Sequence, residues 1–200
     1  YASYASQPDK IIDFAGLSER NPSIYAWITV PGTKIDYPVV MAERGEDFYL
    51  THDAFGNKSY SGAIFAESYN SPDFSDRMTL LYGHNMRDGS MFHGLRAFQD
   101  AKFFDAHDSI TIYWGDVCFT YKIIACYTTT DEHLLLQRDF ADDAVWKDYL
   151  AGIGAQRDLS ANLRDVEALS LDDRLLTLST CVSDQDDKRL FVQAVLVNHE

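Results

Sequence analysis

Cys181 is the residue of this sequence whose type and position best suit nucleophilic chemistry. It closes the apolar run 175–180 and stands immediately before the polar stretch 182–188. A thiol placed where a buried strand runs into a polar loop lies at a rim that a substrate can reach. Such a thiol, taken alone, is more often structural than catalytic. A catalytic interpretation therefore requires partners for it elsewhere in the chain.

A nucleophilic thiol requires a nearby base or cation that supplies the thiolate and later protonates the leaving group. Six histidines compete for this role. His84 is the strongest candidate because it follows the apolar run 78–82 through a single glycine, which places it at a strand end. His52 is a weaker candidate. The other four have helical or loop contexts that are typical of surface or capping residues: His93, His107, His133 and His199.

Acyl transfer also builds negative charge on the carbonyl oxygen of the substrate, so a donor must meet that oxygen. Arg189 is the only arginine after Cys181 and begins the next apolar run, 189–197. If the two residues flank one hairpin loop, their side chains face the same groove. Alone, Arg189 reads as a solvated cation at a strand end. Together with Cys181 and His84 it predicts an acyl-transfer enzyme.

The overall charge restricts the classes of partner. Lysine and arginine total 17 against 31 aspartates and glutamates, a formal net charge of −14. This charge disfavours nucleic-acid binding and adhesion to anionic lipid through a basic patch. No run approaches the ~18 apolar residues of a membrane helix. The first residues carry no signal-peptide pattern and look like a cut inside a longer protein, so an anchor upstream of residue 1 stays open.

Three cysteines leave at least one thiol free or bonded to another molecule. Cys118 and Cys126 lie in one expected strand, 117–129, and a spacing of ~3.3 Å per residue places them beyond disulfide reach of each other. We expect both to be small buried side chains with inert thiols. The chain is therefore not a disulfide scaffold.

The spacing of apolar residues predicts a single, mainly β domain with added helices. Residues 7–20 predict an amphipathic helix that ends at Asn21-Pro22. The expected strands are 24–30, 35–41, 63–66, 78–82, 109–114, 117–129, 174–181 and 189–197, and the other expected helical segments are 91–98, 102–107 and 139–155. The last strand is apolar on both faces, which suits a closed sheet. We therefore predict a β-barrel with an N-terminal helix and an added helix between late strands.

The motifs around these residues resemble a known family. Thr177-Leu178-Ser179-Thr180-Cys181 followed by Arg189, with Leu81-Tyr82-Gly83-His84-Asn85 upstream, resembles the signature of sortases. Sortases are the cysteine transpeptidases that attach proteins to Gram-positive cell walls. Similarity to class B members extends over nearly the whole chain, through the segments 27–40, 61–65 and 89–93 and the two expected helices 7–20 and 139–155.

The resemblance implies an eight-stranded sortase barrel over residues 23–200, with a helical segment 1–22 packed on it. Cys181 would attack the carbonyl of a threonine in a C-terminal sorting signal, form a thioester and release the downstream peptide. His84 would protonate that leaving amine and then deprotonate an amine of a peptidoglycan precursor. Arg189 would hold the substrate and stabilise the oxyanion. The resemblance implies no cofactor and no metal.

Three further residues are expected to bind substrate: Tyr82, Asn85 and Ser179. In a regular strand Ser179 shares a face with Cys181, and Tyr82 stands similarly to His84. Thr180 points to the opposite face, so we expect it to be structural.

The loop that follows Cys181 departs from what a reactive thiol prefers. It carries Asp184, Asp186 and Asp187. Three carboxylates near the site would raise the pKa of the thiol and compete for Arg189, or they would point outward and select a cationic nucleophile. The sequence leaves both possibilities open.

Several functional alternatives also stay open. A class B-like sortase can polymerise pilins, and a cysteine protease would release the acyl group to water, although papain-like chains place cysteine before histidine. A non-catalytic binding module is disfavoured because Cys181, His84 and Arg189 are present together. A metal site of His84, His93 and Cys181 is disfavoured because that trio lacks the close paired spacing of zinc ligands. The sorting signal is expected to be NPxTN-like or xPxTG-like, on a haem-uptake or other surface protein. The expected location is the extracellular face of the cell membrane.

Overall fold

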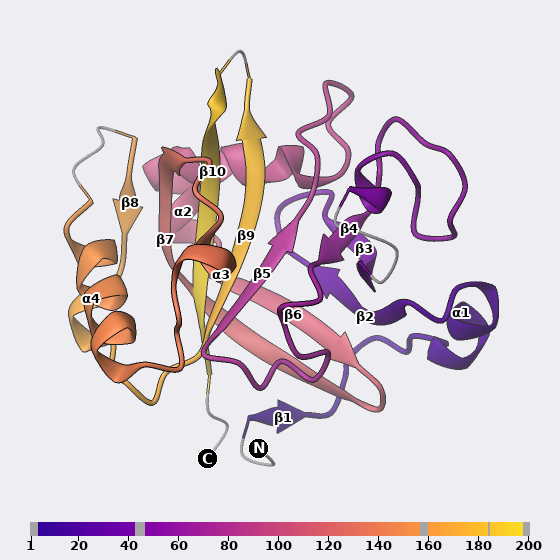
Figure 1. Cartoon of the computed structure of the whole chain (residues 1–200), viewed down its shortest axis with the longest axis horizontal. Helices are drawn as coiled ribbons and strands as arrows, with labels where there is room; N and C mark the ends of the chain where they lie inside the picture. The colour runs from indigo at the N-terminus through magenta and orange to yellow at the C-terminus, as the bar shows by residue number, and fades with distance from the viewer. Residues whose placement is uncertain (1–3, 43–46, 157–159, 184, 198–200) are drawn as a thin grey trace.

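The computed structural model describes residues 4–42, 47–156, 160–183 and 185–197 (Figure 1). The strands are β1 Ala5–Ser6, β2 Ile24–Thr29, β3 Asp36–Met41, β4 Ile64–Ala66, β5 Met78–Tyr82, β6 Ser109–Trp114, β7 Val117–Thr130, β8 Asn162–Leu163, β9 Leu175–Val182 and β10 Gln185–Leu196. The helices are α1 Phe14–Arg20, α2 Ala101–Ala106, α3 Leu134–Gln137 and α4 Asp143–Gly154, with 3-10 turns η1 Phe48–Leu50, η2 Phe92–Gln99 and η3 Val166–Ala168. No helix in these ranges has the length and apolarity that a bilayer crossing needs.

Eight of the strands close into a barrel, as predicted. The hydrogen-bonded order is β7-β10-β9-β5-β4-β3-β2-β6, and β6 pairs with β7 again to complete the ring. The β5–β9 and β3–β4 pairs are parallel and the other neighbours in the ring are antiparallel. The short strands β1 and β8 add to β7 outside this ring.

The last strand, β10, is buried on both faces, as its sequence predicts. Leu190, Val192 and Ala194 point into the barrel core. Phe191, on the other face, belongs to a second cluster that the barrel shares with α4. A strand covered on both sides reads as a continuous apolar run because neither face meets water.

The N-terminal helix is shorter than predicted. It begins at Phe14, where the carboxylate of Asp13 caps it by accepting a hydrogen bond from the Gly16 N–H at 2.9 Å. The residues before the cap are tied to barrel side chains instead: the Tyr113 hydroxyl donates to Asp9 at 2.7 Å, and Lys10 pairs with Asp36. The expected helix over 7–20 was therefore wrong in its first half, where Ile11 is 95% exposed.

The connection between β7 and β9 carries the added helices. The predicted helix over 139–155 begins at Asp143, where the Asp142 side chain caps the N–H groups of Ala144 and Val145. Trp146 and Ile153 pack into the second cluster. A separate short helix, α3, precedes it and was not predicted.

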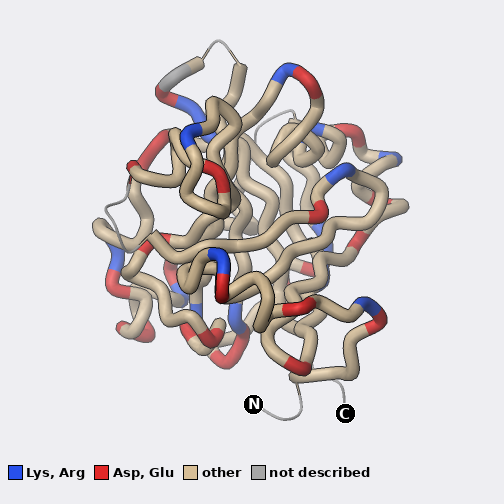
Figure 2. Tube along the Cα trace, turned by 90° about the vertical axis from the view of Figure 1, so that its right-hand side faces the viewer, with Lys and Arg blue, Asp and Glu red and all other residues tan. Residues whose placement is uncertain are grey.

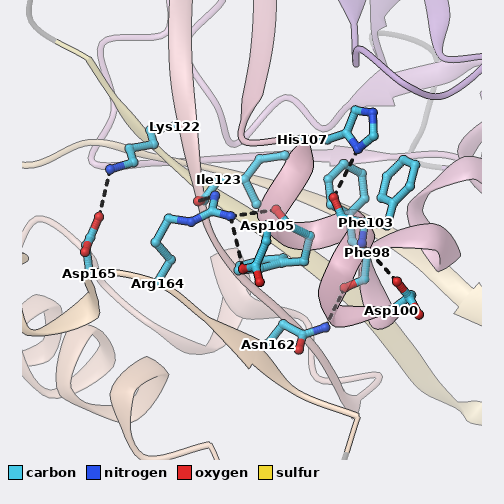
Figure 3. Close-up of polar contacts among 11 residues, drawn as sticks. Phe98, Asp100, Phe103, Asp105, His107, Lys122, Ile123, Asn162, Arg164 and Asp165 are labelled. Atoms are coloured by element: carbon cyan, nitrogen blue, oxygen red, sulfur yellow. Dashed lines mark hydrogen bonds and ion pairs between the residues drawn. The ribbon is translucent and has the colours of Figure 1, made fainter.

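The far part of this connection is fastened to β7 and α2 by polar contacts (Figure 3). The Arg164 guanidinium donates to the Phe104 carbonyl at 2.6 Å and the Ile123 carbonyl at 3.1 Å, and it stacks on the Phe104 ring. The Asn162 amide donates to the Phe98 carbonyl at 2.8 Å. These bonds to three backbone carbonyls fix the path of the chain around β8.

A buried polar network joins α4 to the barrel wall. The amide of Gln193, which is completely buried, donates to the Tyr149 hydroxyl at 2.7 Å and the Thr177 hydroxyl at 2.8 Å. Its carbonyl oxygen accepts from the Tyr127 hydroxyl at 2.9 Å. Burial raises the pKa of Tyr149 to about 12, so the phenol stays protonated within this network.

Replacing Gln193 with leucine should destabilise the fold by about 2–3 kcal/mol, because three hydroxyl groups lose a buried partner at once. Urea unfolding followed by tryptophan fluorescence measures this change. Tyr127→Phe, which removes one bond and leaves the amide of Gln193 paired, is the matched control and should cost about 1 kcal/mol. Equal stability of Gln193→Leu and the unmodified protein would show that the network does not stabilise the fold.

Candidate active site

The strand register brings His84, Cys181 and Arg189 to one end of the barrel. β5 and β9 run parallel with Tyr82 beside Ser179, so the chain that leaves β5 at His84 stays next to the end of β9. In the antiparallel pair of β9 and β10, Arg189 lies directly opposite Cys181. The three predicted residues are therefore neighbours although 105 positions separate His84 from Arg189.

Thr180 holds these two strand ends together. Its buried hydroxyl donates to the Gly83 carbonyl at 2.7 Å, and the Gly83 N–H donates to the Ser179 carbonyl at 3.2 Å. The structural role expected of Thr180 matches these bonds, although part of the residue also borders the pocket described next. The residues immediately before His84 and Cys181 are thus cross-linked by hydrogen bonds.

A pocket of about 350 Å³ opens at this end of the barrel, and we call it the cysteine pocket. Its wall includes five of the six residues expected at the site: Tyr82, His84, Ser179, Cys181 and Arg189. Cys181 itself is exposed, whereas Cys118 and Cys126 are buried free thiols, as expected. A substrate can therefore reach the Cys181 thiol from solvent.

Asn85, the sixth predicted residue, is not part of this wall. Its amide donates to the Cys181 carbonyl at 3.0 Å and to the Ser183 hydroxyl at 3.3 Å. Its side-chain oxygen contacts Nδ1 of His93 at 2.9 Å. Asn85 therefore anchors the backbone that carries the thiol. His93 was expected to be an ordinary surface residue, but it orients the Asn85 side chain.

The hydrogen bond of His84 assigns its proton. Nε2 lies 2.8 Å from the Leu50 carbonyl oxygen, and a carbonyl can only accept. Nε2 therefore carries a hydrogen and donates it to Leu50. Nδ1 is therefore the nitrogen at which this imidazole could exchange a proton, because the Nε2 hydrogen is held by the backbone.

Gly62 makes room for this imidazole. It has a φ of +61°, and a Cβ at this position would lie 2.5 Å from the Tyr49 carbonyl oxygen and 3.0 Å from Cδ2 of His84. Both the left-handed backbone and the close approach require glycine.

Gly62→Ala should therefore displace His84 and lower the transfer rate, in addition to a backbone cost of about 1–2 kcal/mol. Gly115→Ala is the matched control, because Gly115 also has a positive φ of 57° but a Cβ there meets nothing within 4 Å. Thermal unfolding and peptide turnover should be measured for both variants. The hypothesis that Gly62 positions His84 fails if both variants keep the same turnover.

Four carboxylates make the cysteine pocket acidic: Asp47, Glu67, Asp131 and Glu132. Glu67 is the buried member, at 6% exposure, and its Oε1 lies 2.8 Å from Nε2 of His133. The Leu136 N–H donates to Nδ1 of His133, so Nε2 bears the hydrogen that Glu67 accepts. This pair was not predicted, because Glu67 and His133 lie 66 positions apart on different connections.

The acidic loop after Cys181 is described only in part. Asp184 and the side chain of Asp186 lie outside the described residues, so their effect on the thiol stays a prediction. Asp187 is exposed, and its carbonyl accepts from the Asp131 N–H at 3.1 Å. It does not border the cysteine pocket.

Comparison with known proteins agrees with the motifs and the barrel. The family model described as Sortase domain matches residues 28–197. Sortase B of Listeria monocytogenes is 34% identical over 183 residues, which cover 90% of this chain and 72% of that protein. The crystal structure of Clostridium perfringens sortase B superposes with a TM-score of 0.82 at 33% identity, covering 92% of this chain and 99% of that one.

The chain therefore belongs to the sortase family, whose members are transpeptidases that act at the Gram-positive cell surface. Within that family it is a class B sortase, because its relatives by sequence and by structure are sortases B. A Staphylococcus aureus sortase B–substrate complex also superposes, with a TM-score of 0.80 and 25% identity over 94% of this chain and 85% of that one.

Proposed function

We propose that this protein cleaves a C-terminal sorting signal after threonine and transfers the acyl group, through a Cys181 thioester, to an amine of a cell-wall precursor. The observation that carries this proposal is the strand register that places His84, Cys181 and Arg189 around one open pocket. Membership of the sortase family supports the reaction class. The signal, NPxTN-like or xPxTG-like, is part of the proposal.

In the first half-reaction the Cys181 thiolate attacks the threonine carbonyl carbon, and the negative charge moves to the carbonyl oxygen. Arg189, opposite Cys181 in the register, donates to that oxygen. The C–N bond then breaks, the leaving nitrogen takes a proton from the His84 imidazolium, and a thioester remains. Tyr82 and Ser179, on the same wall, contact the bound peptide.

In the second half-reaction an amine attacks the thioester carbonyl. His84, now neutral, accepts the proton of the attacking nitrogen, and the C–S bond breaks to restore the thiolate. The same imidazole thus acts as acid and then as base. The proposed location is the outer face of the cell membrane, through an N-terminal anchor.

The test is an assay with a fluorescent sorting-signal peptide in the presence and absence of an amine acceptor. A protein mass increased by the acyl fragment, and a transfer product that depends on the acceptor, would support the proposal. Release of the free acid alone, at a rate unaffected by amine, would support a hydrolytic protease. Formation of neither species would contradict both enzymatic readings.

A further inference from the structure

A second hollow adjoins the cysteine pocket, and His84 belongs to the walls of both. This hollow, which we call the groove, measures about 1110 Å³ and is bounded by residues 50–51, 58–60 and 84–88. Leu50, whose carbonyl accepts the His84 hydrogen, is also shared by the two walls. Cys181 borders only the cysteine pocket. The proposed acid–base residue therefore stands between two separate spaces.

Backbone hydrogen bonds shape the groove before any ligand arrives. On one wall the Ser59 N–H donates to the Thr51 carbonyl at 2.9 Å, and Asp53 accepts from the N–H groups of Phe55 and Asn57. On the other wall the Gly89 N–H donates to the Met86 carbonyl at 3.1 Å. The two walls are the loop that precedes β4 and the loop that follows β5 in Figure 1. A preformed site loses less conformational entropy on binding.

The groove differs from the cysteine pocket in its charge. It presents two exposed cations, Lys58 and Arg87, and one carboxylate, Asp88. The Asp88 carboxylate accepts hydrogen bonds from the N–H and the hydroxyl of Ser90 at 3.0 and 2.6 Å. Figure 2 shows acidic residues along many segments of the chain, with lysines and arginines between them, and the formal net charge is −14. The groove therefore offers anions a local positive site beside His84.

An aromatic side chain completes the wall. Tyr60 is 91% exposed although it is large and partly apolar. An exposed aromatic ring that borders a hollow is typical of a residue that packs on a ligand.

We propose that the groove binds the acyl acceptor, a peptide that carries a primary amine together with free carboxylates. This inference rests on the proposed function and adds to it the place and chemistry of the second substrate. The acyl chain occupies the cysteine pocket after the first half-reaction, so the amine must reach the thioester from another side. The groove leads to the imidazole that accepts the amine proton.

The bonds exchanged in this step balance without a further reactant. The amine nitrogen forms a bond to the thioester carbon, and the bond from that carbon to the Cys181 sulfur breaks. The proton lost by the nitrogen passes to His84, and the thiolate is regenerated. Lys58 and Arg87 hold the carboxylates of the acceptor and take no part in the proton transfer.

The experiment compares three amines in the transfer assay: N-acetyl-γ-glutamyl-lysine with free carboxylates, the same dipeptide with both carboxylates amidated, and hydroxylamine. In the unmodified protein the free dipeptide should have a lower KM than the amidated one.

Lys58→Glu should raise the KM of the free dipeptide about three- to tenfold. About 0.5 M salt should shrink this difference in KM between the variant and the unmodified protein. Hydroxylamine, which is too small to require the groove, should react with similar efficiency in both proteins. Lys102→Glu, an exposed charge reversal on α2 outside the groove, is the matched control and should leave all three amines unaffected.

The outcomes separate the two proposals. Suppose that the thioester forms normally, that free and amidated dipeptides are used equally, and that Lys58→Glu has no effect. This result would overturn the groove assignment and leave the proposed transpeptidase function unaffected. Absence of any thioester in the unmodified protein would overturn the proposed function, and the groove assignment with it. A second measurement is NMR titration of Cys181→Ala with the free dipeptide, where shifts at residues 58–60 and 85–88 are expected; shifts confined to the cysteine pocket would contradict the proposal.

Discussion

Replacing Cys181 with alanine is expected to abolish both the thioester and the transfer product, with a fall in turnover of at least about 10³-fold. The reason is that the other two thiols are buried and border neither hollow, so no described cysteine can take over the attack. Mass spectrometry of the protein detects the thioester, and chromatography of the peptide detects the product. Because Cys181 is exposed, its truncation should change stability by no more than about 0.5 kcal/mol.

Cys118→Ala is the matched control for this prediction. Cys118 sits in β7, where its thiol contacts the Ser6 hydroxyl at 3.2 Å, outside the cysteine pocket. This variant should keep its transpeptidation rate while losing some stability. Retention of more than a small fraction of activity by Cys181→Ala, with its fold intact, would show that another group is the nucleophile.

The positions of these residues were predictable because each lies beside a strongly apolar strand. The runs 78–82, 175–180 and 189–197 are long enough to identify strands, and a residue at a strand end lies at the rim of a sheet. The closed barrel was predictable from the double apolar face of β10. That these strand ends lie next to one another in space was harder to predict. The parallel pairing of β5 with β9 is a long-range contact, and the local sequence pattern does not encode it.

Other parts of the site depend on contacts that leave no local pattern. The sequence around Glu67 does not indicate a partner 66 positions away; His133 caps the start of α3, and its imidazole meets the Glu67 carboxylate there. The first half of the predicted N-terminal helix failed for a similar reason. Its apolar spacing was real, but Asp9 and Lys10 find partners on the barrel, and the Asp13 cap then fixes where the helix begins.

Arg189→Lys should reduce turnover about 10²- to 10³-fold although it keeps the positive charge. Arg189 lies opposite Cys181 and borders the cysteine pocket, with its Nη1 donating to the Lys188 carbonyl at 3.0 Å. A guanidinium can keep this backbone bond and still aim a second N–H at the substrate oxygen. A lysine ammonium is a single point on a flexible stem and cannot hold both directions at once.

The division of this loss between kcat and KM tests the role assigned to Arg189. A donor that meets the oxyanion acts mainly in the transition state, so kcat should fall much more than KM rises. A residue that only holds the peptide would instead raise KM. Arg96→Lys, an exposed substitution on η2 outside both hollows, should leave both parameters unchanged. If Arg189→Lys turns over at a near-normal rate, the oxyanion must be stabilised by another group, and the assignment of Arg189 is wrong.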